Sequence, residues 1–411
     1  MKLFQLRKAV ILLCVSAFLS TNAQEPNAPK FGKGLFNLMG QDSTWSMKIG
    51  LRFQTLATSN WDINNGLSNP ESSMLIRRSR LKFDGFAFSP KLKYKVELGL
   101  SNRDQSGASI YTGNASRQIL DAVLKWNFSG NFVLWLGQTK LPGNRERVIS
   151  SANLQQVDRS LLNSRFTIDR DMGLQLRHQF KLSDTFLIKE IFSIAQGEGR
   201  NITTGNIGGH QYTTRLELFP FGDFASKGDY KGSDLKFEPK PKLSIGVAYD
   251  FNNNASKTRS NQGSYMFIDN TENKGLNDRL YHRTNIATLF VDAMYKHKGF
   301  SLMAEYANRT ADEAFARNSD GTFTGDKVQV GTGLNLQTGY LLSKTIELSG
   351  RYTNISLDKE VTGKGAENQY TLGLSKYIAE HSLKVQTDLS YTDIGFKTNQ
   401  LLFRVQVDIH F

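Results

Sequence analysis

Apolar and polar residues alternate with a period of two along almost the whole chain of 411 residues. In the stretch 92–100 every second residue is apolar, and the residues between are lysine, glutamate or glycine. The stretch 401–411 repeats the pattern and ends on Phe411. Successive side chains of a β-strand point to opposite faces, so the pattern predicts strands with one apolar and one polar face. A soluble β-sandwich would alternate too, and the connections between strands must therefore decide the fold.

The connections alternate between short and long. Six have at most three residues, and eight are long: 58–73, 102–116, 140–170, 197–209, 253–286, 309–327, 357–367 and 393–399. The sixteen strands that they join lie at about 46–57, 74–88, 91–101, 117–128, 131–139, 171–181, 185–196, 210–220, 241–252, 287–298, 299–308, 328–342, 344–356, 368–378, 381–392 and 400–411.

An even number of strands, with short turns at one end and long loops at the other, is typical of barrels that cross an outer membrane. We therefore predict an all-β fold, a 16-stranded antiparallel transmembrane β-barrel over residues 46–411 with long external loops. A barrel of this size leaves an aqueous lumen, and Gly331, Gly333 and Gly339 keep one polar strand face thin. The connection 221–240 departs from the rule, because it is long where a short periplasmic turn is expected.

The N-terminus has the pattern of a secretory signal peptide over residues 1–23. Lys2, Arg7 and Lys8 precede an apolar stretch at 9–19, and small residues before Gln24 predict cleavage after Ala23. Residues 24–45 would then form an N-terminal periplasmic segment. Cleavage removes Cys14, the one cysteine of the chain, and reduces the formal net charge from +13 to +10. We expect export to the outer membrane of a Gram-negative bacterium.

Basic residues concentrate on the polar, inward phase of three consecutive strands. They are Arg52, Arg78, Arg80, Lys82, Lys93 and Lys95, and Lys125 and Arg177 extend the set on later strands. Inside a narrow lumen such a field concentrates anions and repels cations. The alternative is a balanced lumen, because Asp84, Glu97, Asp121 and Asp408 share the inward phase.

The loop 140–170 is long for a connection without secondary structure, which indicates a functional role or disorder. Its acidic residues are Glu146, Asp158 and Asp169. Its basic residues are more numerous, and they are Lys140, Arg145, Arg147, Arg159, Arg165 and Arg170. Arginine offers a planar fork that matches oxyanions. Folded into the lumen, the loop would act as a constriction that sets selectivity. On the surface, its opposite charges would only hold the loop together.

Several segments resemble the phosphate-selective porin O and P family. The most specific are LGQTKLP at 136–142, RER at 145–147, SS at 150–151, VDRS at 157–160 and DRDMG at 169–173. IRRSRLK at 76–82 is similar to the second strand of the family, and RLELFPFG at 215–222 and GRYTNI at 350–355 look like Bacteroidetes-type members.

The resemblance implies a trimeric barrel whose third external loop folds inward, and anion passage along arginines and lysines of the lumen. By position, Lys140, Arg145, Arg147, Arg159 and Arg170 match the loop pattern of the family, and Arg78 and Arg80 match its basic strand. Lys140 is the phosphate-binding lysine that the resemblance suggests.

We therefore predict an outer-membrane porin that lets small anions such as phosphate diffuse, in contact with outer-membrane lipid and assembled as a homotrimer. A general non-selective porin and a surface adhesion barrel, using loops such as 253–286, are the alternatives. The six histidines lack metal-site spacing, so we expect no metal. A hydrolase would need a Ser–His pair oriented by a third group. His178 and Ser193 lie on adjacent predicted strands, but any serine-rich barrel offers such pairs, so we expect no enzyme activity and no cofactor. Nucleic acid is not an expected partner, because the basic clusters follow strand phase.

Overall fold

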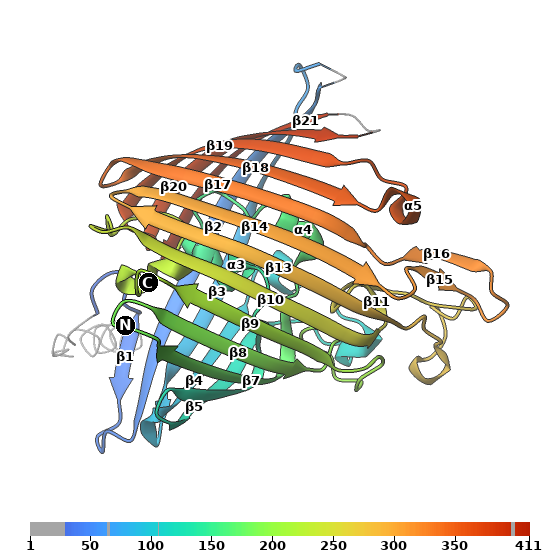
Figure 1. Cartoon of the computed structure of the whole chain (residues 1–411), viewed down its shortest axis with the longest axis horizontal. Coiled ribbons are helices and arrows are strands. Elements are labelled where there is room, and N and C mark those ends of the chain that lie inside the picture. The colour runs from blue at the N-terminus through green and yellow to red at the C-terminus, as the bar shows by residue number, and fades with distance from the viewer. Residues whose placement is uncertain (1–28, 64–65, 106, 396–398) are drawn as a thin grey trace, which may run out of the picture.

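The computed structural model describes residues 29–63, 66–105, 107–395 and 399–411. The predicted signal peptide, and residues 24–28 of the segment after it, lie outside these ranges. Sixteen strands form one antiparallel barrel, closed by pairing of β2 with β21 from Arg52 opposite His410 to Asp62 opposite Gln400 (Figure 1). The predicted fold class is confirmed.

The strands lie close to their predicted positions. They are β2 (Trp45–Asp62), β3 (Glu71–Ala87), β4 (Ser89–Gly99), β5 (Ile119–Ser129), β6 (Phe132–Lys140), β7 (Arg170–Lys181), β8 (Leu187–Ala195), β9 (Gln211–Phe219), β10 (Lys242–Ala255), β13 (Thr284–His297), β14 (Phe300–Ala311), β17 (Gly331–Ser343), β18 (Ile346–Leu357), β19 (Glu367–Ala379), β20 (Leu383–Ile394) and β21 (Gln400–His410). A short strand, β1 (Phe36–Met39), pairs with the start of β2.

Side chains alternate between the lumen and the outer surface. In β9, for example, Thr213, Arg215 and Glu217 are buried inside, whereas Tyr212 and Leu216 are exposed on the outside. Polar groups inside and apolar groups outside are the reverse of a soluble domain. A wall of this kind suits a hydrocarbon environment, because all backbone groups of a closed barrel are paired between strands.

The long loops gather at one end of the barrel and the short turns at the other. The loops contain two hairpins, β11 (Lys257–Arg259) with β12 (Gln262–Tyr265) and β15 (Phe315–Arg317) with β16 (Phe323–Lys327). They also contain the short helices α2 (Asn102–Gln105), η2 (Ile110–Thr112), η5 (Leu276–Asp278) and α5 (Lys359–Thr362). Across the ranges that the structure describes, no helix is long and apolar enough to span a membrane.

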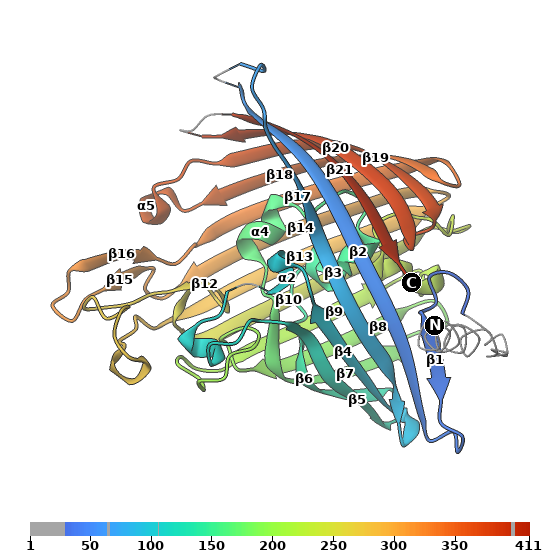
Figure 2. The ribbon, with the colours of Figure 1, turned by 180° about the vertical axis from the view of Figure 1, so that it is seen from behind.

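The third loop, residues 141–169, folds into the barrel. It contains α3 (Arg145–Val148), η3 (Ser151–Asn153) and α4 (Leu161–Phe166), and opposite views both show α4 within the ring of strands (Figures 1 and 2). Its apolar residues Leu162, Phe166 and Ile168 pack against inward-facing apolar residues of the wall. Gly333 makes the approach possible, because a Cβ there would lie 2.8 Å from the ring of Phe166. The inward fold of this loop is confirmed.

The connection between β9 and β10, residues 220–241, also enters the barrel, from the end that carries the short turns. It contains η4 (Ala225–Tyr230). Phe224 joins a buried cluster with Ile149 and Leu154 of the third loop and with Met294 and Met303 of the wall. The third loop and the 220–241 segment therefore meet inside the barrel.

Candidate functional site: the lumen channel

A cavity of about 1400 Å³ follows the inner face of β3 to β9. Its lining includes Pro90 and Lys91 near the short turns, and Arg103 and Arg200 in the long loops, so it extends between the two ends of the barrel. In the ranges that the structure describes, β2 and β10 to β21 contribute no lining residue. The third loop and the 220–241 segment occupy that other part of the lumen, and the channel is consequently one-sided.

Basic side chains dominate the channel wall. Among its described lining residues, seventeen are lysine or arginine and eight are aspartate or glutamate, an excess of nine positive charges. Low-dielectric walls on all sides focus the field of such charges along the channel axis. The wall is therefore suited to attract anions over its whole length.

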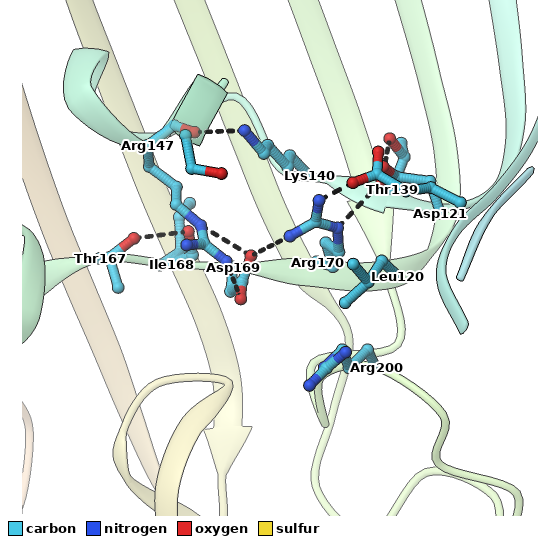
Figure 3. A network of polar contacts seen from close by, with 12 residues as sticks. Leu120, Asp121, Thr139, Lys140, Arg147, Thr167, Ile168, Asp169, Arg170 and Arg200 are labelled. Carbon is cyan, nitrogen blue, oxygen red and sulfur yellow. Dashed lines mark hydrogen bonds and ion pairs between the residues drawn. The ribbon is translucent and has the colours of Figure 1, made fainter. Parts of the chain in front are cut away.

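A chain of ion pairs links the third loop to the channel wall at the start of β7 (Figure 3). Arg147 binds Asp169 through its Nε atom at 2.7 Å, and Arg170 lies 3.6 Å from the same carboxylate. Arg170 also donates to Asp121 at 3.0 Å. Burial by itself would raise the pKa of Asp169. The positive charges of Arg147 and Arg170 have the opposite and larger effect, so the pKa lies below its usual value. These pairs fix the guanidinium groups in place.

The ion pairs continue along the wall. Lys95 contacts Asp121 at 2.6 Å and Glu97 at 2.7 Å. Arg80 contacts Glu97 at 3.1 Å and Asp104 at 2.7 Å. Glu97 is shared between Arg80 and Lys95, and Asp121 between Lys95 and Arg170, whereas Asp104 binds Arg80. These pairs fix the positions of the charged groups along the wall.

Three cations near the constriction are held by backbone carbonyls. Lys140 Nζ donates to the carbonyl of Arg147 at 2.8 Å (Figure 3), and to the carbonyl of Ile149 at 3.1 Å. Arg159 donates to the carbonyls of Glu146 and Ile149, and Arg200 to those of Arg117 and Asp104. Carbonyls carry no net charge, so these hydrogen bonds hold the three groups in place without pairing them with a carboxylate.

A second basic group lies nearer the short turns. Lys93 and Lys125 are opposite each other on β4 and β5, and Lys125 is opposite Trp135 of β6. Lys125 Nζ lies 3.9 Å, and the guanidinium carbon of Arg177 3.8 Å, from the centre of the indole ring. Such cation–π contacts position both cations without neutralising them.

Eight of the twelve predicted anion-binding residues line the channel, namely Lys140, Arg147, Arg159, Arg170, Arg78, Arg80, Lys93 and Lys95. The other four, Arg52, Lys82, Arg145 and Arg165, lie outside the described lining. Arg52 binds Asp408 and Ser151, and Arg165 binds Glu367. Lys82 pairs with Asp84 on its own strand.

Arg145 differs most from the expectation. Its side chain is fully buried, 2.9 Å from Asp292 and 3.2 Å from Glu217, and it donates to Ser244 at 2.8 Å. The sequence of the loop shows how many arginines it contains, but not which of them form ion pairs with carboxylates of the barrel wall. Arg145 anchors α3 to the wall and is turned away from the channel.

Sequence reasoning missed several lining cations, among them Arg103, Lys189, Arg200, Arg215 and Lys227. Arg215 was detectable, because it lies on the inward phase of a predicted strand. Arg103, Arg200 and Lys227 lie in long connections, where no periodicity shows direction. In the described part of the chain, no three His, Cys, Asp or Glu side chains form a group that could hold a metal ion.

The model of the family described as "Phosphate-selective porin O and P" matches residues 47–395. The chain belongs to this porin family. Porins are channels of the outer membrane of Gram-negative bacteria and not enzymes, and the family description agrees with an anion preference. The search of curated proteins found no match.

Solved porin structures share the fold of this porin. Salmonella typhi OmpF in complex with daunomycin has a TM-score of 0.55 at 11% identity, over 92% of this chain and 100% of that one. An anion-selective porin from Comamonas acidovorans has a TM-score of 0.53 at 12% identity, over 89% of this chain and 100% of that one. The trimer form of OmpT from Vibrio cholerae has a TM-score of 0.51 at 12% identity, over 90% and 100%.

Proposed function

We propose that this porin conducts small oxyanions of the phosphate type along the β3–β9 wall, with its preference set by the channel's lysines and arginines. The one-sided channel, with seventeen basic and eight acidic lining residues, carries the proposal. A channel of this kind attracts anions by its field and holds them only weakly at any one point.

Passage would take place in steps between neighbouring cations. An anion would meet Arg103 and Arg200 at the external end and pass Lys140, Arg147 and Arg170 beside the third loop. It would then pass Lys93, Lys125 and Arg177 towards the periplasm. Exchange of part of its water for guanidinium and ammonium donors stabilises the anion in each position, while several similar sites allow it to leave. In this scheme the third loop is the constriction.

We also propose that the chain is exported with cleavage of its signal peptide and assembles as a homotrimer. The OmpT structure described as a trimer form has the same fold, and it supports a homotrimer for this chain. Cross-linking of the native protein in detergent should give a species of three chains, and a monomer would contradict this part. N-terminal sequencing of the mature protein should begin at Gln24, with residues 24–45 remaining on the periplasmic side.

The reversal potential in a planar bilayer under a salt gradient tests the proposed function. We expect a potential of the sign that chloride flux produces, and a reduction of the chloride current when phosphate is added. A potential near zero with large conductance would contradict the anion preference. Absence of any current would contradict a channel and would favour the alternative of a surface adhesion barrel that uses its loops.

A general porin is the second candidate. The observation in its favour is that Glu97, Asp104, Asp121 and Asp169 each bind lining cations. If these pairs cancelled the field, anions and cations would permeate alike. Replacing Lys93 and Lys125 together by glutamine separates the two candidates. The anion preference should fall in a selective channel and stay unchanged in a general one.

A further inference from the structure

The channel wall contains one tryptophan. Trp45 and Trp126 are exposed and do not line the channel, and Trp61 donates through its indole N–H to the carbonyl of Leu67 in the first external loop. Trp135 of β6 is the only tryptophan among the described lining residues, and its side chain is half-buried there. An aromatic surface is therefore built into a channel that is otherwise dominated by charge.

Trp135 lies between cations of the neighbouring strands. It is opposite Lys125 of β5, which is opposite Lys93 of β4. Val133 precedes Trp135 by two residues, so it shares the inner face of β6, and it is opposite Arg177 of β7. All five residues line the channel. Val133 and Trp135 thus form a small apolar surface with basic side chains on both sides.

The two nearest cations contact the ring and keep donors for a solute. Lys125 Nζ and the guanidinium carbon of Arg177 lie 3.9 Å and 3.8 Å from the centre of the indole ring. Among the described residues, neither cation forms an ion pair with a carboxylate. Arg177 donates to the side-chain oxygen of Gln175, through Nε at 3.2 Å and Nη2 at 2.8 Å. Its other N–H groups and the ammonium of Lys125 are therefore available to an anion.

The indole N–H of Trp135 is a further available donor, because no residue in the described part of the chain accepts a hydrogen bond from it. The ring itself offers an apolar face and edge. A single side chain therefore combines an apolar surface with a polar group, next to two positive charges.

An inorganic oxyanion cannot use the apolar part of this surface. The face of an aromatic ring carries the negative side of its quadrupole, which repels an anion. Apolar surface stabilises a bound solute only where apolar surface of the solute covers it. A solute that joins an oxyanion to a flat apolar group satisfies both requirements. Its oxyanion binds the two cations, and its flat group packs against the ring edge, the valine or the guanidinium plane, which also stacks on aromatic groups.

We propose that this porin favours organic oxyanions in which the charged group is attached to a flat apolar group. Lys125 and Arg177 hold the oxyanion, and Trp135 with Val133 recognises the apolar group. Trp135 is then a specificity-determining residue of the channel. The inference rests on the proposed anion path and narrows its solutes to one chemical class.

Block of the chloride current by two related phosphates tests this inference. Phenyl phosphate and methyl phosphate have the same charged group and differ in the group attached to it. Each would be added to the full-length mature porin in a planar bilayer at about pH 8, where both are dianions. The measured quantity is the concentration that halves the chloride current. In the parent, phenyl phosphate should reach this point at about fivefold lower concentration than methyl phosphate.

Three variants locate the effect. Trp135→Thr removes the ring and keeps a residue suited to a strand, so the ratio of the two concentrations should fall to about one. Trp135→Phe keeps an aromatic ring and should retain most of the difference. The matched control is Trp126→Leu on the neighbouring strand β5, where the exposed tryptophan does not line the channel. Its ratio should equal that of the parent.

Equal block by the two phosphates in an anion-selective parent would overturn the inference and leave the proposed function intact. This result is also the one expected if Trp135 only kept the two cations apart, and it requires no variant to fold. A ratio that persists in Trp135→Thr, or that Trp126→Leu abolishes equally, would overturn the inference as well. A parent without anion preference would instead overturn the proposed function, so the two failures are distinguishable.

Discussion

Arg145 and Arg147 lie two residues apart in α3 and have opposite environments. Arg145 is fully buried between Asp292 and Glu217, whereas Arg147 is partly exposed in the channel and binds Asp169. Residues two positions apart on a helix do not share a face. The same residue type thus serves as an anchor at one position and as a channel charge at the next.

Substitution of the two arginines should separate these roles. Arg147→Ala should reduce the anion preference and leave the barrel stable, because its partner Asp169 keeps Arg170 nearby. Arg145→Ala leaves Asp292 and Glu217 buried with less compensation, which costs about 3–5 kcal/mol for a broken buried pair. Reversal potentials and thermal unfolding in detergent would measure the two effects. Equal stability of both variants would contradict the anchoring role.

The response to pH should depend on Arg147. In the parent, the charges of Arg147 and Arg170 outweigh burial and keep the pKa of Asp169 below its usual value. Arg147→Ala removes the larger of these two charge effects, so the pKa of Asp169 rises and the carboxylate binds a proton at higher pH. Protonation removes a negative charge from the channel. Acidification from pH 7 to pH 5 should therefore raise the anion preference more in this variant than in the parent.

Arg147→Lys is the matched control for the pH experiment, because it keeps a positive charge beside Asp169. Its pH response should resemble that of the parent. The same reversal potentials at both pH values for Arg147→Ala and the parent would contradict this account of Asp169.

At the level of elements, the third loop is held on one side of the lumen by apolar packing. Phe166 is fully buried against Ile355, Ala307 and Phe290 of the wall. Phe166→Ala would remove this contact, at about 3–5 kcal/mol for a buried aromatic residue. We expect an intact barrel with a loosened loop, and therefore a noisier single-channel current with lower anion preference.

Leu161→Ala serves as the control for Phe166→Ala. Leu161 belongs to the same helix but is only partly buried at the edge of the cluster. Its truncation should change the current noise less. Equal noise in the two variants would show that packing at Phe166 does not hold the loop.

The order of the elements could be predicted from sequence because strand phase and loop length are local signals. All sixteen strands and the alternation of their connections are confirmed. The position of the third loop against β10 to β18 could not be predicted, because it depends on packing against Phe290 and Ala307. The sequence shows that these apolar side chains face inward, but not which segment covers them. The entry of the 220–241 segment was missed for the same reason. Lys296, which donates to three of its backbone carbonyls, is an ordinary alternating residue in the sequence.

For the molecule as a whole, the excess of basic over acidic lining residues is spread along the channel and does not form one site. Selectivity from a distributed field is sensitive to screening, and the Debye length falls from about 10 Å at 0.1 M salt to about 3 Å at 1 M. The reversal potential at a fixed concentration ratio should therefore shrink as both solutions become more concentrated. A constant potential would indicate selection by close contact alone.

The bonds that hold the third loop reach far along the chain. Lys384 of β20 donates to the carbonyl of Leu154 at 2.7 Å, across 230 residues of sequence. Contacts between such distant residues form slowly, because the chain between them must be ordered first. We therefore expect the constriction to form late in folding. A chain that stopped before β20 would contain every arginine and lysine of the third loop, and it would still lack a bond that holds this loop in the lumen.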